Sequence, residues 1–270
     1  MYTKKIILLP IFLLSLFLSE PCASINWDTL SNGLELGRAL SPLYEPSDSA
    51  YIHILRIDPA VYSLHLMNAS HPEQGQRLTA REWARQEGFT AVINAAMFQR
   101  DFLRSVSFMK SNEHTNNSFV SRDKSFLAFD PLAEKLPEIK IIDRECDDFD
   151  HLRNKYGSMV QSIRMLSCTG RNVWQKSERR WSIASVGLDS TGNLLFFHAT
   201  APHSVNEFID VIKDLPISLK RAMYMEGGSQ AQLFIQTETR SLEFIGNYSS
   251  GGRAFTVSAL PNVLGIMKKN

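Results

Sequence analysis

The hydrophobic positions of this chain recur mostly at every second residue, which is the spacing of half-buried β-strands. The run 62–67 (YSLHLM) alternates cleanly, and 34–40 and 52–58 are also strand-like. Further strands are predicted at 91–94, 125–129, 139–142 and 159–165, and a hairpin turning at 190–193 joins two more. The first half of the chain is therefore predicted to be rich in β-structure.

Helical signals are fewer and local. Thr79 with Glu82, and Ser204 with Glu207, each have the spacing of a capping box at a helix start. The first of these helices is expected to end near Gly88, and a third, short helix is expected within 148–156. Together these elements predict an α+β fold, a single mixed and β-rich domain with a few helices.

An acid and two glycines interrupt what otherwise reads as continuous strand at 222–235 (AMYMEGGSQAQLFI). The break consists of Glu226, Gly227, Gly228 and Ser229. Paired glycines permit positive φ and leave the backbone uncovered, so a ligand could approach a carboxylate at the end of a rigid strand. A hairpin turn with an exposed glutamate is the other interpretation of this pattern.

The first 24 residues resemble an export signal. Lys4 and Lys5 precede an apolar run over 6–18, and small residues suitable for cleavage follow at 22–24. The apolar run is shorter than the roughly 20 residues that a membrane span needs. We therefore expect residues 1–24 to be a signal peptide, residues 25–270 to form one domain, and the protein to be secreted, into the periplasm, without stable membrane insertion.

The net charge argues against nucleic-acid binding. The formal net charge of the whole chain is +1, and loss of the predicted signal peptide leaves it neutral. Nucleic-acid binding depends on a basic field, which a neutral chain without runs of like charge does not provide. Nucleic acid is therefore not an expected partner.

The cysteine count acquires meaning from export. Apart from Cys22, beside the predicted cleavage site, the chain contains only Cys146 and Cys168. An even pair in an oxidising compartment predicts a disulfide, with a pair of buried free thiols as the alternative. Two cysteines outside a CxxC arrangement do not make a zinc site.

Several polar residues are candidates for binding. Asn94 ends a short buried strand, Asp101 follows in an irregular segment, and Arg180 stands where the first strand of the 190–193 hairpin begins. Each also has an ordinary structural interpretation: Asn94 as a strand-end cap, Asp101 as a loop cap and Arg180 as a solvated strand residue.

The order of these motifs resembles the phosphodiester glycosidase family. The resemblance rests on INAAMFQRD, a strand pair opening at an arginine, a capped helix, YMEGGSQAQLFI and LPNVLGI, and covers about 33–267. It implies hydrolysis of the bond between a sugar anomeric carbon and a phosphodiester oxygen. The chain departs from the common family pattern at Ala96 and Ser107, where relatives often have glycine, and at Glu226, where many have aspartate.

Chemistry assigns roles to these residues. A phosphodiester is a good leaving group, so its departure needs neutralisation of oxygen charge more than proton donation. Arg180 could bind the phosphate, and Glu226 could stabilise a cationic sugar centre or act as base or nucleophile. We place Glu226, Arg180 and Asp101 in the catalytic set, and assign substrate binding to Asn94, Gly227, Gly228 and Ser229.

A carbohydrate or sugar-phosphate substrate is the expected partner, and an exported carbohydrate-binding protein without catalysis is the competing class. Ala96 is the residue that separates the two. No cofactor is expected, although an oxygen-ligated ion such as calcium stays open without a motif. His198 and His203 lack metal-site spacing and are assigned to packing or to the surface.

Overall fold

The computed structural model describes residues 24–247 and 257–269, so the predicted signal peptide lies almost wholly outside the described residues. The described chain forms three antiparallel sheets and three α-helices, and the predicted α+β, β-rich class is confirmed. The first sheet has the order β1 (Ile25–Ser31), β2 (Leu34–Leu40), β3 (Tyr51–Ile57), β12 (Leu194–His203), β11 (Trp181–Asp189) and β13 (Leu219–Gly227).

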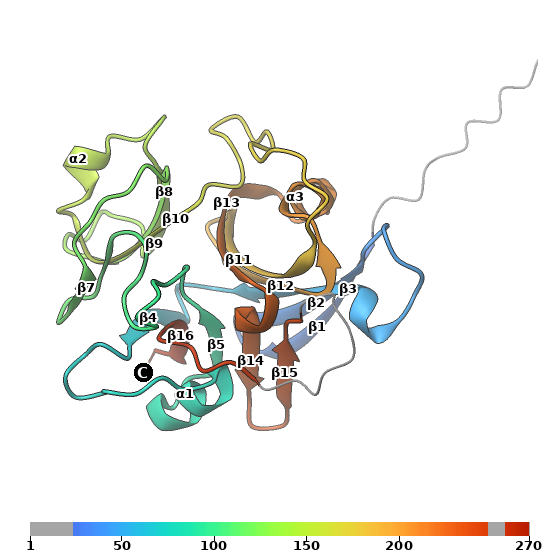
Figure 1. Cartoon of the computed structure of the whole chain (residues 1–270), viewed down its shortest axis with the longest axis horizontal. Helices are drawn as coiled ribbons and strands as arrows, with labels where there is room; N and C mark the ends of the chain where they lie inside the picture. Colours follow the sequence, from blue (N-terminus) through green and yellow to red (C-terminus); the bar gives the residue numbers. More distant parts are fainter. Residues whose placement is uncertain (1–23, 248–256, 270) are drawn as a thin grey trace, which may run out of the picture.

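The two smaller sheets have five strands each. The second has the order β7 (Thr115–Asn117), β6 (Met109–Lys110), β10 (Tyr156–Ser162), β8 (Ser125–Pro131) and β9 (Ile139–Asp143). The third has the order β15 (Ser241–Ile245), β14 (Gln232–Gln236), β5 (Ala91–Asn94), β16 (Asn262–Lys268) and β4 (Tyr62–Asn68). In Figure 1 the second sheet lies at upper left, the third at the bottom, and the first curves beside α3.

One hydrophobic core joins the three sheets. It contains Leu55 of β3, Ile93 of β5, Leu127 of β8 and Val186 of β11, each with no exposed surface. The alternation of each strand supplies one face to this core, and the opposite faces need other cover. The shared core places the ends of strands from different sheets close together.

The helices, α1 (Ala80–Glu87), α2 (Phe149–Leu152) and α3 (Val205–Asp214), provide part of that cover. Phe208 and Ile209 of α3 pack on the outer face of the first sheet, and Trp83 of α1 packs on the third. Both predicted capping boxes are present, and α1 ends at Gly88 with φ of 72°. These local predictions are confirmed.

The strand predicted at 159–165 needs correction. The apolar run predicted as a strand at 159–165 divides between two sheets, because β10 ends at Ser162 and the next residues leave it. The amide of Met165 donates to the carbonyl of Ala222, and the amide of Tyr224 donates to the carbonyl of Ile163. This segment therefore continues along the free edge of β13. The stretch 112–124, whose polar composition is typical of a loop, contains β7, whose Asn116 is buried.

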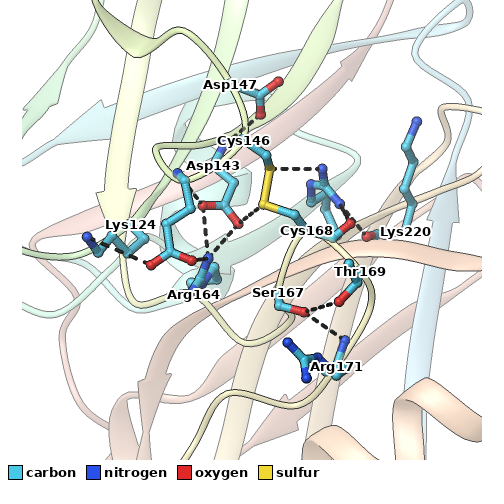
Figure 2. Close-up of a disulfide and its surroundings, with 12 residues drawn as sticks. Lys124, Asp143, Cys146, Asp147, Arg164, Ser167, Cys168, Thr169, Arg171 and Lys220 are labelled. Carbon is cyan, nitrogen blue, oxygen red and sulfur yellow. Dashed lines mark hydrogen bonds and ion pairs between the residues drawn. A yellow bond between two sulfur atoms is a disulfide. The ribbon is translucent and has the colours of Figure 1, made fainter.

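The predicted disulfide is formed. Cys146 follows β9 and Cys168 lies in the connection from β10 to β11, with their Cα atoms 6.2 Å apart. Figure 2 shows the bridge beside Asp143 and Arg164. Arg164 Nη1 donates to both carboxylate oxygens of the fully buried Asp143, at 3.1 and 3.0 Å, and to Glu145 at 2.7 Å. Bridge and ion pair together fix this connection against the second sheet.

Replacing both cysteines by serine is expected to lower the free energy of unfolding by about 3 kcal/mol. The bridged residues are 22 apart in sequence, and closing a loop of that length restricts the unfolded chain by about this amount. Denaturant unfolding of wild type and double variant measures the loss. Alkylation of unreduced native protein is the control: rapid labelling of Cys146 or Cys168 would contradict the bridge.

Candidate functional site

Glu226 stands at the end of β13, directly after a β-bulge. In the pairing with β11, Glu226 lies opposite Ala184 and Tyr224 lies opposite Ser185, so Met225 is the extra residue. A bulge bends its strand and redirects the following side chain, and bulges are common beside active sites. The bulge therefore determines where the Glu226 carboxylate points.

The Glu226 carboxyl group has an unusual charge state. Burial raises its pKa to about 7, and the hydrogen bond from the Gly227 amide at 3.0 Å lowers it only in part. Among the described residues, no cation forms an ion pair with Glu226. A carboxyl group with a pKa near neutrality can exchange a proton at physiological pH, as general acid–base catalysis requires.

Glycine is required at 227 and favoured at 228 for two different structural reasons. A Cβ atom at Gly227 would lie 2.1 Å from Trp181 Cδ1 and 2.5 Å from the Tyr224 hydroxyl, so no side chain fits there. Gly228 has φ of 64° and begins the 3-10 turn η2 (Gly228–Gln230), a conformation that favours glycine. In the same turn Ser229 Oγ accepts a hydrogen bond from Ser258 Oγ at 2.9 Å.

Asn94 comes to the same end of the molecule from the third sheet. Its Oδ1 accepts from the amide of Gln232 at 3.2 Å, just after the EGGS turn, and its buried Nδ2 has no hydrogen-bond partner. The amide of Ala96 contacts Met225 Sδ at 3.4 Å, so the segment after β5 meets the bulge of β13. The structure thus brings Asn94 and the Glu226 turn together.

Ala96 adopts the conformation that glycine would allow. Its φ is 54°, in the left-handed region, where a residue with a Cβ atom is strained by about 1 kcal/mol or more. The alanine is buried, and the packed ends of β5 and β13 hold it there. Ala96 thus keeps the left-handed backbone conformation that glycine adopts without strain.

Asp101 lies at the tip of a hairpin in which Val106 N donates to Met97 O. Its carboxylate accepts from the amides of Leu103 and Arg104 at 3.0 Å each and from Arg104 Nε at 2.6 Å. The Arg104 side chain is the main reason that the pKa of Asp101 falls to about 2. Asp101 thus caps its own turn. Among the described residues, no hydrogen bond or ion pair joins it to Glu226, so its catalytic role stays a prediction.

Arg180 precedes β11, and its guanidinium forms an ion pair with Glu207. The same Glu207 side chain closes the capping box of α3 by accepting from the amide and hydroxyl of Ser204. Arg180 remains partly exposed, with 39% of its side chain accessible. It is joined to the Glu226 turn through the backbone, because the next residue, Trp181, packs on Gly227.

Aromatic residues around the turn were not among the sequence candidates. Trp181 Nε1 hydrogen-bonds with the Tyr224 hydroxyl at 3.0 Å, and the Trp174 ring lies 5.4 Å from the Tyr224 ring. Tyr224 and Trp181 are each close in sequence to a predicted site residue, which was the available signal. Only the fold reveals that Trp174 joins them.

One group of side chains has the residue types of a metal site. Within the described part of the chain, the one group of metal-ligating side chains is Asp143 with Cys146 and Cys168. Because these two sulfur atoms are bonded to each other, they are not thiolate ligands.

In residues 24–247 and 257–269, no helix is long and apolar enough to cross a membrane.

The comparison with family models decides the family. The phosphodiester glycosidase model matches residues 87–267, which include Asn94, Arg180 and Glu226. The chain belongs to the phosphodiester glycosidase family. No curated protein sequence matches it.

Solved structures agree on the fold of this phosphodiester glycosidase family member. One is the catalytic domain of zebrafish N-acetylglucosamine-1-phosphodiester alpha-N-acetylglucosaminidase, auto-inhibited by its pro-peptide, with a TM-score of 0.63, 12% identity, and coverage of 93% of this chain and 85% of that one. A hypothetical protein from Synechocystis matches with a TM-score of 0.62 and 13% sequence identity, over 91% of this chain and 64% of that one. An exported protein from Burkholderia pseudomallei matches with a TM-score of 0.54 and 9% sequence identity, over 80% of this chain and 74% of that one.

Proposed function

We propose that the protein is an exported hydrolase that cleaves the bond between a sugar anomeric carbon and a phosphodiester oxygen. Family membership supports the reaction class, and the zebrafish relative is named for such a bond. The observation that carries the proposal is Glu226, a half-buried carboxyl group with a pKa raised to about 7 at a bulged strand end. A sugar 1-phosphodiester of an envelope or extracellular glycan is the proposed substrate class.

In the proposed step, Glu226 acts as the base. A water oxygen forms a bond with the anomeric carbon, the bond from that carbon to the phosphodiester oxygen breaks, and its electron pair stays on the phosphate. Glu226 accepts the proton of the water, and the products are the free sugar and a phosphomonoester. Since the leaving phosphate is stable as an anion, no strong acid is required.

The polar residues around the turn support this arrangement. Asn94 holds the start of β14 through Gln232 and has an unpartnered buried Nδ2, a donor available to a hydroxyl group or water. Gly227 and Gly228 leave the backbone uncovered, and Ser229 lies in the same turn. We propose that these four residues position the sugar, and that Asp101 contributes from the neighbouring hairpin.

Arg180 is proposed to bind the phosphodiester. Arg180→Lys keeps the positive charge and loses the planar fork, so kcat/KM is expected to fall about 100-fold, roughly 2.7 kcal/mol. The measurement is steady-state hydrolysis of a synthetic sugar 1-phosphodiester, such as N-acetylglucosamine 1-phosphomethyl ester. Hydrolysis by wild-type protein is the test of the proposed function itself, and absence of turnover would favour the carbohydrate-binding alternative.

Glu207→Gln is the matched control for Arg180. Glutamine also serves at this position of a capping box, so α3 is retained while the carboxylate that holds Arg180 is removed. Under the proposed function, kcat/KM in this variant stays near the wild-type value or rises. A loss as large as in Arg180→Lys would instead show that the ion pair is structural.

Export into the periplasm is proposed on the N-terminal pattern of the sequence, and a disulfide is compatible with an oxidising compartment. The mass of the protein recovered from its native host checks this. A chain that still begins at Met1 would contradict it.

A further inference from the structure

A pocket lies at the segment that pairs with the edge of β13, and none of the proposed reaction residues lines it. It has a volume of about 410 Å³ and is formed by two segments, 122–124 and 173–175, together with Ile163 and Arg164. Ile163 is hydrogen-bonded to Tyr224, two residues before Glu226. The pocket and Glu226 are therefore connected through the same edge strand, β13.

Trp174 is the aromatic wall of this pocket, and it is fixed from several sides. Its indole N–H donates to the carbonyl of Arg164 at 2.8 Å, and its ring packs against Tyr224 at 5.4 Å. Its backbone is held by the side chains of Asn172 at 3.1 Å and Asn206 at 2.6 Å. A tryptophan held this firmly yet partly exposed is a preorganised surface for stacking.

The polar wall is made by Arg122 and Asp123. Asp123 Oδ2 accepts hydrogen bonds from the hydroxyls of Ser107 at 3.0 Å and Ser121 at 2.8 Å, which fix the carboxylate. The side chain of Arg122 is exposed and has no hydrogen bond or ion pair with any described residue. The guanidinium is therefore available to a ligand, as is Gln175 on the facing segment.

We infer that this pocket is a carbohydrate subsite, in which a sugar ring stacks on Trp174 while Arg122 and Asp123 bind its hydroxyl groups. A sugar presents an apolar C–H face and a rim of hydroxyls, which match an indole face and planar polar side chains. Few, fixed polar groups around an aromatic surface are typical of small-molecule sites. The inference goes beyond hydrolysis, because this subsite binds glycan whether or not Glu226 turns it over.

The test is binding of two neutral oligosaccharides, the N-acetylglucosamine tetramer and maltotetraose, measured by titration calorimetry at pH 7. Wild type is expected to bind at least one of them, and Trp174→Ala to weaken that binding at least 10-fold. Trp174→Phe retains an aromatic face and is expected to recover part of the affinity. Arg122→Ala is expected to weaken binding several-fold.

The controls separate this subsite from the reaction and from folding. Arg85 is exposed on α1, outside the pocket, so Arg85→Ala is expected to bind as wild type does. Glu226→Gln is expected to bind normally even if it abolishes turnover, which distinguishes failure of this inference from failure of the proposed function. The inference is overturned if wild type binds neither oligosaccharide up to 10 mM, or if folded Trp174→Ala binds as tightly as wild type.

Discussion

Replacing Glu226 with glutamine is expected to lower kcat/KM on a sugar 1-phosphodiester about 1000-fold. Glutamine keeps the shape of the side chain but cannot accept the proton of the attacking water, and general base catalysis contributes on the order of this factor. The loss corresponds to roughly 4 kcal/mol of transition-state stabilisation. Initial rates over a range of substrate concentrations measure it.

The pH dependence of turnover provides a second signature of the same group. Because burial raises the pKa of Glu226 to about 7, the basic form is lost as pH falls below 7, and wild-type kcat/KM should fall with it. The Glu226→Gln variant should lack this limb. A wild-type profile that is flat between pH 5.5 and 8 would exclude Glu226 as the base.

Stability should change in the opposite direction to activity. The folded-state pKa of about 7 exceeds the ordinary value of 4.5, so the carboxyl group destabilises the fold increasingly as pH rises from 4.5 through 7. At pH 8, Glu226→Gln is therefore expected to unfold at a higher temperature, with a gain of up to about 3 kcal/mol. At pH 4.5 this gain should nearly vanish. A variant less stable than wild type at pH 8 would contradict a partly desolvated carboxylate without a cationic partner.

Acid is expected to destabilise the fold through a buried histidine pair. His53 of β3 and His198 of β12 are cross-strand partners, and the His53 ring stacks on Phe244 at 3.9 Å. Burial lowers the pKa of His53 to about 3, with smaller effects from His198 and Arg38, and burial lowers the pKa of His198 to about 4. Neither ring has a carboxylate partner among the described residues, so protonation is uncompensated.

The fold is expected to lose stability as these two histidines become protonated. Both folded-state pKa values lie below the ordinary value of 6.5, so the unfolded chain binds more protons and stability is lost as pH falls below 6.5. Each histidine should cost about 2 kcal/mol between pH 6.5 and 4.5. Glu226 opposes this trend by regaining stability over the same interval, so denaturant unfolding is measured in the Glu226→Gln background, where the contribution of the histidines is not masked.

His198→Gln in that background is the discriminating variant. Glutamine can donate to the Ala231 carbonyl, which lies 3.1 Å from His198 Nε2, and it does not titrate, so the loss between pH 6.5 and 4.5 should shrink by about 2 kcal/mol. His151 is exposed in the short helix α2, and His151→Gln should leave the loss unchanged. An equal effect of the two substitutions would show that the buried pair is not the cause.

Local signals in the sequence were sufficient for much of the fold. The capping boxes at Thr79 and Ser204 depend on residues three apart, and both are formed. The strand at 159–165 was misplaced because periodicity does not reveal that one apolar run can serve two sheets. β1 was not predicted, because its polar residues carry little apolar periodicity and its place is set by pairing with β2.

The candidate site could be predicted only in part. The EGGS break and Asn94 were visible as strand ends, and the structure places them together. The ion pair of Arg180 with Glu207 and the junction of Trp174 with Tyr224 depend on contacts between residues 27 and 50 positions apart. The raised pKa of Glu226 likewise comes from burial by the tertiary fold, which no local pattern reports.

The position of β16 has a consequence for how the protein matures. β16 lies between β4 and β5, and its residue Asn262 pairs with Asn68, so the middle of the third sheet is closed by segments 194 positions apart. Such long-range pairing is entropically costly and slow. A nascent chain lacking residues 262–268 cannot complete this sheet, so the third sheet closes only after nearly the whole chain has been synthesised.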